Sequence, residues 1–146
     1  KVKSLVTALE DGEVSVIAHQ ANCFSKMGAG IAPVLARRWP EVAEVDSVST
    51  APRHKIGGVS IAKVDEGQIF HLNGQFYPGK NTDYYALKQA MKQMTTYVAA
   101  YEKIGLPKLG CGIGGGDWSI VSEIIEEVFE AYDVTIYVLS EGDIPA

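Results

Sequence analysis

Apolar and polar positions alternate along the chain with two different periods. Residues 2–9 are rich in β-forming side chains, and residues 14–18 form a mostly apolar run typical of a buried strand. A helix is expected over residues 31–39, because Pro33 is tolerated only in a first helical turn. A second short helix is expected over residues 41–49. The first third of the chain therefore predicts two strands followed by two helices.

The rest of the chain continues the alternation. Residues 59–64 alternate in polarity, and residues 68–72 follow after a tight turn, which predicts a hairpin. Apolar residues at three- and four-residue steps predict a long helix over residues 82–103. These apolar residues would form one face of the helix, which we expect to lie in the core: Leu87, Met91, Met94, Val98 and Tyr101. A brief strand over residues 106–109, an amphipathic helix and a strand over residues 134–139 complete the pattern.

Strands that alternate with helices, with one hairpin inserted, predict an α/β protein. We expect a three-layer α/β/α sandwich with a mixed six-stranded sheet and helices on both faces. The chain of 146 residues has the length of one ordinary domain, so residues 1–146 are expected to form a single domain. A hydrophobic fraction of 47% with 21% charged residues favours a soluble globular protein over a disordered one.

Two glycine-rich runs each lie between a strand-like and a helix-like segment. Residues 27–32 read MGAGIA, and residues 110–117 read GCGIGGGD. Glycine turns let backbone N–H groups converge on a phosphate, and the helix that follows adds its positive end. Because ligands of open α/β sheets bind beyond the carboxyl ends of the strands, both turns are expected to meet on one rim and hold a diphosphate. The alternative is that the glycines only permit tight turns.

The glycine runs do not fit other nucleotide-binding motifs. Gly110, Gly112 and Gly115 have the spacing of a dinucleotide fingerprint, but only one strand remains downstream for a complete binding unit. No Gly-Lys-Ser/Thr follows either run, which argues against a P-loop, and no Gly-x-Ser-x-Gly indicates a serine hydrolase.

Charge and cysteine content restrict the partners further. The net charge of −5 argues against broad capture of nucleic acid, so an anionic ligand would be held by local geometry. We interpret Cys23 and Cys111 as reduced thiols near the pocket. Because His19, His54 and His71 are scattered and stand at no metal-ligand spacing from a cysteine, we expect no metal and no cofactor. The apolar stretches are too short for a bilayer, so we expect a cytoplasmic monomer with no membrane partner.

Three polar residues accompany the glycine runs, and each has two interpretations. His19 ends an apolar strand as either a satisfied neutral histidine or a functional group. Asp117 precedes the last helix, where a cap would contribute about 1 kcal/mol. The amide of Asn22 suits either an Asx turn in its own loop or the hydroxyls of a sugar.

The chain resembles the macrodomain family of ADP-ribose-binding α/β modules over nearly its whole length. The resemblance rests on residues 16–22 (VIAHQAN), on 27–32 before a helix ending in 37–42 (RRWPEV), and on 106–118 (LPKLGCGIGGGDW). Within the family it is most similar to the branch of ADP-ribose-1''-phosphate phosphatases and hydrolases of ester-linked ADP-ribose.

The resemblance implies roles for these residues. His19 and Asp117 would be the catalytic pair that flanks the scissile bond at the 1'' position, with the acid and base assignment open. Asn22 would contact the distal ribose. The remaining ligand-binding residues would be Met27, Gly28, Ala29, Gly30, Ile31, Gly110, Gly112, Ile113, Gly114, Gly115 and Gly116.

Two departures from the family pattern bear on the ligand and the reaction. The family usually has Gly-Asp-Leu or Gly-Asp-Ile at the end of the first strand, whose aspartate binds adenine, where residues 7–9 here read TAL. Glu10 or Asp11 would take that role, or the ligand would bind loosely or differ at that end. Residues 73–77 (NGQFY) lack the lysine nucleophile of one subgroup, which disfavours a lysine adduct. The expected function is hydrolysis at the 1'' position of an ADP-ribose derivative, and the alternative is a non-catalytic binding module.

Overall fold

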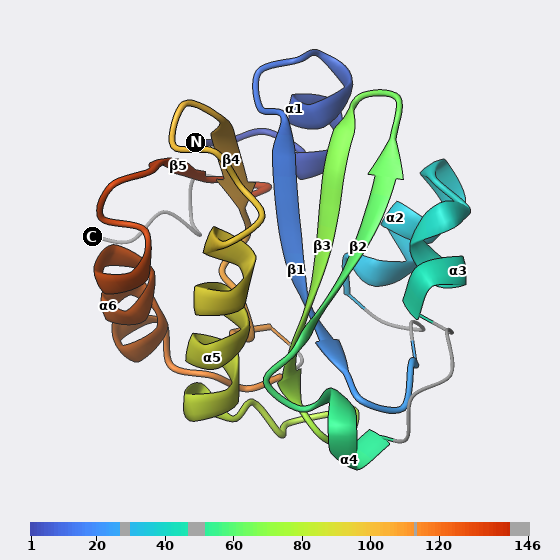
Figure 1. The fold of residues 1–146 in the computed structure, drawn as a ribbon, viewed down its shortest axis with the longest axis vertical. Helices are drawn as coiled ribbons and strands as arrows, with labels where there is room; N and C mark the ends of the chain where they lie inside the picture. Colours follow the sequence, from blue (N-terminus) through green and yellow to red (C-terminus); the bar gives the residue numbers. More distant parts are fainter. Residues whose placement is uncertain (27–29, 47–51, 113, 141–146) are drawn as a thin grey trace.

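The computed structural model describes residues 1–26, 30–46, 52–112 and 114–140 (Figure 1). The elements follow one another as α1 (Leu5–Glu10), β1 (Val16–Asn22), α2 (Ala32–Arg38), α3 (Glu41–Asp46), α4 (Pro52–Lys55), β2 (Val59–Val64), β3 (Gly67–Gln75), α5 (Tyr84–Thr95), β4 (Lys103–Leu106), α6 (Trp118–Val128) and β5 (Asp133–Ile136). No helix in these ranges is both long and apolar enough to cross a membrane.

The five strands form one mixed sheet in the order β2-β3-β1-β4-β5. β1 is central and runs parallel to both β3 and β4, and β4 runs parallel to β5. Only β2 is antiparallel to its neighbour, because it is joined to β3 by the predicted hairpin. The carboxyl ends of β1, β3 and β4 therefore point toward the same edge of the sheet.

The expected first strand is wrong, and the sheet has five strands instead of six within the described residues. That segment is mostly the helix α1, in which Leu5, Ala8 and Leu9 are buried. Their spacing of three and four residues is helical, and the burial of this face outweighs the β propensity of the segment. Only an isolated bridge between Val2 and Val138 remains of the sixth strand.

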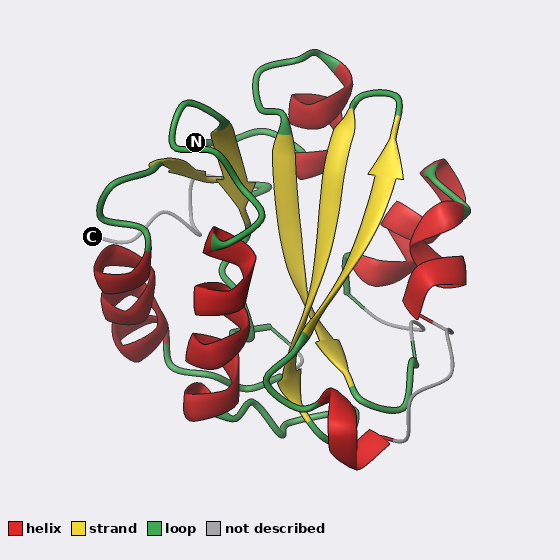
Figure 2. Cartoon of the chain, viewed as in Figure 1, coloured by secondary structure: helices red, strands yellow, loops and turns green. Residues whose placement is uncertain are grey.

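Helices cover both faces of the sheet (Figure 2). Alternate residues of β1 and β3 point to opposite faces, so each strand contributes to two separate cores. The core beneath α5 and α6 includes Val16, Ala18, Phe70, Leu72, Leu87, Met91, Met94, Val121 and Ile125. The core beneath α1, α2 and α3 includes Leu5, Leu9, Ile17, Leu35, Trp39, Val42 and Ile69.

Helix α5 is shorter than the predicted helix over residues 82–103. It begins after Asp83, whose carboxylate accepts a hydrogen bond from the Ala86 N–H at 3.0 Å, and it ends at Thr95. Tyr101 is 86% exposed, so its expected place in the core is wrong, whereas Val98 is buried. The three members of the predicted apolar face that lie inside the helix, Leu87, Met91 and Met94, are fully buried.

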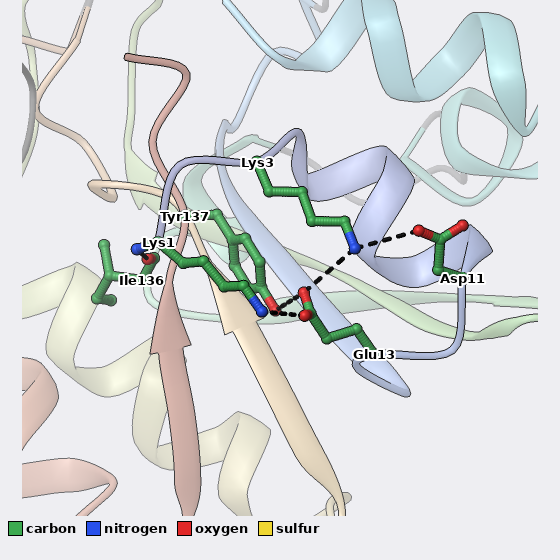
Figure 3. Close-up of polar contacts among 6 residues, drawn as sticks. All are labelled: Lys1, Lys3, Asp11, Glu13, Ile136 and Tyr137. Atoms are coloured by element: carbon green, nitrogen blue, oxygen red, sulfur yellow. Dashed lines mark hydrogen bonds and ion pairs between the residues drawn. The ribbon is translucent and has the colours of Figure 1, made fainter. Parts of the chain in front are cut away.

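A cluster of charges joins the start of the chain to β5 and the loop after α1 (Figure 3). The Lys1 ammonium contacts the Glu13 carboxylate, and Lys3 Nζ lies 3.1 Å from Asp11 and 3.6 Å from Glu13. The Tyr137 hydroxyl donates to Glu13 at 2.7 Å. Hydrogen bonds from Lys1 and Tyr137 lower the pKa of Glu13 to about 2. Because Glu13 precedes β1, this cluster lies at the end of the sheet opposite to the carboxyl ends of the parallel strands.

Candidate functional site

A cavity of about 420 Å³ opens at the carboxyl ends of β1, β3 and β4. Segments from both glycine runs line it, as the placement of the runs after two neighbouring strands predicts. The expected site residues that the cavity brings together are His19, Asn22, Gly30, Ile31, Gly110, Gly112 and Gly114.

The other expected site residues have different places. Gly115, Gly116 and Asp117 are described but do not line the cavity. The remaining four, Met27, Gly28, Ala29 and Ile113, lie outside the described residues. The ligand contacts expected of all these residues stay predictions.

His19 lies at the back of the cavity as one half of a buried histidine pair. It faces His71 across the β1/β3 register, and its Nε2 atom lies 2.7 Å from the Nδ1 atom of His71. The two rings meet edge to face, with centroids 4.6 Å apart. The side chains are 1% and 0% exposed. One ring must donate its N–H to a ring nitrogen of the other, so the tautomers of the two residues are linked.

Burial keeps both imidazoles neutral at neutral pH. It lowers the pKa of His19 to about 4. Burial, followed by repulsion from His19, moves the pKa of His71 far below its usual range. His19 has one buried ring nitrogen, Nδ1, that is without a hydrogen-bond partner in the described part of the chain.

Asn22 holds its own loop together. Its side-chain oxygen accepts hydrogen bonds from the Phe24 and Lys26 N–H groups, both at 3.1 Å, and its Nδ2 atom donates to the Lys26 carbonyl at 2.8 Å. These hydrogen bonds form an Asx-type turn, which is the structural role expected as one alternative for Asn22. Asn22 also lines the cavity, and one N–H of its amide remains beyond these three bonds.

Asp117 is the N-cap of α6. Its carboxylate accepts hydrogen bonds from the backbone N–H of Ser119 at 2.9 Å and from the Ser119 hydroxyl at 2.7 Å. These bonds lower the pKa of Asp117, so the group is a carboxylate at neutral pH. Its backbone N–H donates to the Tyr84 hydroxyl at 2.9 Å. The structure thus gives Asp117 the capping role, and its catalytic role stays a prediction.

A hydrogen-bond network that the sequence analysis missed supports the cavity floor. Gln20 donates from Nε2 to Gln75 Oε1 at 2.6 Å and to Thr82 Oγ1 at 2.8 Å. The Thr82 hydroxyl in turn donates to the carbonyl of Gly110 at 2.9 Å. Polar residues inside an otherwise apolar strand, such as Gln20, were the available signal. The network connects β1, β3 and the segment before α5 to the second glycine run.

Glycine is required at position 114, because the Thr82 hydroxyl and the Gly110 carbonyl of this network lie too close for a side chain there. A Cβ atom there would lie 2.4 Å from Thr82 Oγ1 and 2.8 Å from the Gly110 carbonyl oxygen. Gly112 differs, because a Cβ atom there would meet no described atom within 4 Å. One glycine is therefore needed for packing, and the other keeps space in the cavity open.

Lysines give the cavity a positive character that the net charge conceals. Lys26 and Lys108 both line it. The Lys108 ammonium lies 5.9 Å from the centre of the Trp118 ring, a cation–π arrangement that holds it near the second glycine run. The aliphatic part of Lys80 lies over Gly115, with its Cγ atom 3.1 Å from a Cβ position there.

The residues considered for adenine recognition lie elsewhere. Ala8 is in α1 and fully buried, so it does not end a strand as expected. The Glu10 carboxylate accepts from Arg38 Nε at 2.6 Å, and Asp11 pairs with Lys3. None of these lines the cavity. The expectation that Glu10 or Asp11 binds adenine therefore has no support in this structure.

The cysteines Cys23 and Cys111 form no disulfide with each other, and neither lines the cavity. Burial raises the pKa of Cys111. Within the described ranges, no group of three or more histidine, cysteine, aspartate or glutamate side chains could hold a metal ion.

Comparisons with known proteins agree with the geometry. A family model described as Macro domain matches residues 18–125. The human ADP-ribose glycohydrolase OARD1 is 31% identical over 126 residues, which cover 82% of this chain and 80% of that protein. An uncharacterized 17.5 kDa protein in the tk-vs intergenic region of Enterobacteria phage T4 is 31% identical over 129 residues, covering 82% and 83%.

The fold is also that of a solved complex. Thermosipho africanus DarTG in complex with ADP-ribose superimposes with a TM-score of 0.75 at 19% identity, covering 90% of this chain and 40% of that one. Such a likeness shows the fold alone. With the family match over residues 18–125 and the two relatives above 30% identity, it follows that this chain belongs to the macro domain family.

Proposed function

We propose that this chain binds ADP-ribose or a close derivative in the cavity and hydrolyses a bond at its distal 1'' position. The observation that carries the proposal is the meeting of Gly30 and Gly112 on one cavity with two lysines in its lining. Backbone N–H groups in glycine turns together with ammonium groups suit a diphosphate. The names of OARD1 and of the DarTG complex support the same ligand class.

The proposed chemistry uses His19 as the base. A histidine with a pKa of about 4 is unprotonated at neutral pH, and its Nδ1 atom has no partner among the described residues. In the tautomer in which His19 donates its Nε2–H to His71, Nδ1 would take the proton of a water bound with the ligand while the bond at the 1'' position breaks, and the leaving oxygen would take a proton from solvent. The amides of the glycine turns would stabilise the negative charge that develops.

Isothermal titration with ADP-ribose tests the binding step, and two substrates test the reaction. Phosphate release from ADP-ribose-1''-phosphate and ADP-ribose release from an ester-linked ADP-ribosyl peptide distinguish the two hydrolase types. Loss of turnover in His19→Gln with retained binding supports the proposed base. Absence of ADP-ribose binding by the wild-type chain would remove the whole proposal.

A non-catalytic binding module is the second candidate, and three observations favour it. Asp117 caps a helix and does not line the cavity, and Asn22 uses its side-chain oxygen and one N–H within its own loop. Gln75, in the segment where one subgroup has lysine, is held by hydrogen bonds to Gln20 and to the Tyr77 carbonyl. Tight ADP-ribose binding with no turnover of either substrate would select this function.

The unit that performs either function is proposed to be one domain and a monomer. Strands from both halves of the chain lead to the cavity and contribute residues to its lining. Sedimentation of the chain with and without ADP-ribose tests the monomer, and a dimer that forms only with the ligand would contradict it.

A further inference from the structure

A second cavity, of about 320 Å³, lies at the outer edge of the sheet. β2 is the edge strand there, and α4 lies next to its first residues (Figure 1). Elements α3, α4, β2, β3 and α5 all contribute to the lining. The polar residues of the lining are His54, Lys55, Ser60, Asn73 and Gln93. We call this space the edge cavity, and no described residue lines both it and the first cavity.

Asn73 supplies the edge cavity with a buried polar side chain. It is 2% exposed, and its backbone is paired with the Gly57 N–H at 2.9 Å and the Gly58 carbonyl at 3.0 Å. Its side-chain oxygen Oδ1 has no hydrogen-bond partner in the part of the chain that the structure describes. Burial of such an oxygen costs free energy that an apolar side chain of the same size would not cost. Folding therefore does not explain the amide, whereas a ligand that completes its hydrogen bonds would explain it.

The neutral polar groups of the edge cavity suit the hydroxyls of a ligand. A half-turn of the Asn73 amide brings either its oxygen or its nitrogen to the cavity, since this torsion angle is broad. Gln93 on α5 offers the same two kinds of atom, and the Ser60 hydroxyl both donates and accepts. A sugar hydroxyl also donates and accepts, so it can pair with each of these groups.

The edge cavity and the first cavity lie at the two ends of one row of side chains. His19 pairs with His71 in the sheet, and His71 pairs with Ser60, so the three side chains share one face. His19 lines the first cavity and Ser60 lines the edge cavity, whereas His71 lines neither. The two cavities are therefore separate spaces with a buried imidazole between them.

Helix α4 brings basic side chains to the edge cavity. Its last turn carries Arg53, His54 and Lys55, of which the last two line the cavity. The Lys55 ammonium also contacts the Ser25 hydroxyl at 2.6 Å. Burial above all, with repulsion from Lys55 in addition, lowers the pKa of His71, so the charge of α4 acts on this face of the sheet. Because no aspartate or glutamate is among the described lining residues, an anionic group is favoured there.

We propose that the edge cavity binds a small sugar or polyol that carries a phosphate group, with hydroxyls on Asn73 and Ser60 and the phosphate near Lys55. The cavity volume lies at the lower end of the range of about 300–1,000 Å³ for small-molecule sites. Inorganic phosphate would fill little of this volume, and an uncharged sugar would leave the basic residues of α4 without a role. The site is distinct from the reaction proposed above and does not depend on it.

Chemical-shift titration of the isotope-labelled chain with ribose 5-phosphate tests the proposal, with ribose and inorganic phosphate as the two partial probes. We expect ribose 5-phosphate to bind most tightly, and saturating ADP-ribose to leave its affinity unchanged. Asn73→Leu should weaken binding at least about fivefold, which corresponds to one net hydrogen bond. The melting temperature of this variant should equal or exceed that of the wild type, because a buried oxygen without a partner in the described chain is removed.

Two further pairs of variants separate the hydroxyl contacts from the phosphate contact. Gln93→Ala should weaken the binding of both ribose and ribose 5-phosphate. Its matched control is Gln89→Ala, one turn earlier on α5, because Gln89 does not line the edge cavity. Lys55→Gln should weaken the binding of ribose 5-phosphate but not of ribose. Lys63→Gln is the control for this charge, since Lys63 is exposed on β2.

The proposal is overturned if no probe shifts a resonance of the wild-type chain at about 10 mM, which would nearly saturate a site with a Kd of about 1 mM. Displacement of ribose 5-phosphate by ADP-ribose would assign it to the first cavity and overturns the proposal as well. Equal affinities in wild type, Asn73→Leu and Gln93→Ala have the same consequence. Inorganic phosphate that binds as tightly as ribose 5-phosphate would overturn the sugar phosphate in favour of a simple anion. Titration of the same variants with ADP-ribose, expected to match the wild type, keeps a failure of the first cavity separate from a failure of the edge cavity.

Discussion

His19 and His71 are partners across the β1/β3 register, and the nearest nitrogen atoms of their rings lie 2.7 Å apart. Neither residue is accessible to bulk water. Among the described residues no carboxylate pairs with either ring, so a proton added to one of them would place an uncompensated positive charge in this buried pair. The pair is therefore stable only in its neutral form, and the stability of the protein depends on pH.

We expect the free energy of unfolding to fall as the pH is lowered from 7 to 5. The pKa of both histidines is lower in the folded chain than the ordinary value of 6.5, so the unfolded chain binds more protons in this range. The stability is fully present above pH 6.5 and is lost as the pH falls toward the folded-state value of about 4 for His19. Each histidine contributes a slope of up to about 1.4 kcal/mol per pH unit. Urea denaturation at several pH values measures it.

The substitution His71→Gln removes one of the two buried imidazoles that bind a proton on unfolding, so the slope of the unfolding free energy against pH should become shallower. His54→Gln is the matched control, because His54 is exposed on α4 and should leave the slope unchanged. An identical slope in wild type and His71→Gln would contradict a neutral buried pair.

A graded series at Gly112 tests the cavity without disturbing the fold. Gly112 has no left-handed φ, and a Cβ atom there meets no described atom within 4 Å. Gly112→Ala, Gly112→Val and Gly112→Phe should therefore change stability by less than about 0.5 kcal/mol, as surface substitutions usually do. We expect ADP-ribose affinity to fall progressively with side-chain size, as measured by calorimetry.

Gly114→Ala is the comparison for this series. Its Cβ atom would press on Thr82 Oγ1 and on the backbone carbonyl of Gly110, which cannot rotate away. We expect it to lower the melting temperature as well as the affinity. If Gly112→Phe and Gly114→Ala both lowered the melting temperature far below that of the wild type, the Gly112 series would change the fold as well as the cavity. The prediction for Gly112 would then be wrong.

Substitutions of Asp117 separate its cap from a catalytic role. Asp117→Ala should destabilise the protein by about 1 kcal/mol, since it removes both hydrogen bonds from Ser119. Asp117→Asn should retain most of the stability, because asparagine caps a helix about as well as aspartate. If Asp117→Asn turns over substrate as fast as the wild type, helix capping is the role of Asp117 and its carboxylate takes no part in the reaction. A large loss of turnover at unchanged stability would establish the carboxylate as part of the reaction.

The Thr82 hydroxyl is expected to hold the second glycine run in place. Thr82→Val keeps the shape but removes the acceptor for Gln20 and the donor to Gly110, so buried polar groups lose their partners. We expect a loss of about 1–3 kcal/mol in the free energy of unfolding, together with weaker ADP-ribose binding. Thr82→Ser restores the hydroxyl and should recover most of both. Unchanged affinity in Thr82→Val would mean that the run holds its shape without the network.

Most of the fold could be predicted because its elements carry strong local patterns. The hairpin of β2 and β3, helix α2 with Pro33 in its first turn, and the presence of a buried strand at β1 follow from periodicity and turn residues. Two strand bounds were wrong: β1 runs to Asn22 and not to residue 18, and β4 is Lys103–Leu106 and not 106–109. The first strand failed because β propensity and helical spacing disagree there, and the burial of Leu5 and Leu9 decided between them. The early end of α5 depends on tertiary packing, which the spacing of apolar residues does not encode.

The site could be predicted only in part. The glycine runs and His19 were identified from their position after strands, but the partner of His19 was not, because its identification needs the register between β1 and β3. The same holds for the contact of Gln20 with Thr82, which are 62 residues apart in sequence. The adenine contact was expected at residues 8–11, at the end of a predicted strand, but these residues belong to α1 and its C-cap.

The alternation of β1 has a consequence for how the site can change. Its neighbours Ile17 and Ala18 belong to the cores on opposite faces of the sheet, so His19 and Gln20 are held on opposite faces too. A one-residue insertion within β1 before His19 would turn the imidazole to the face of Thr82 and put Ala18 opposite His71, and a one-residue deletion would put the Gln20 amide opposite His71. A one-residue change in the length of β1 would therefore move its cavity side chains to the wrong faces of the sheet. Substitution of a side chain in this strand leaves the register intact and is the milder change.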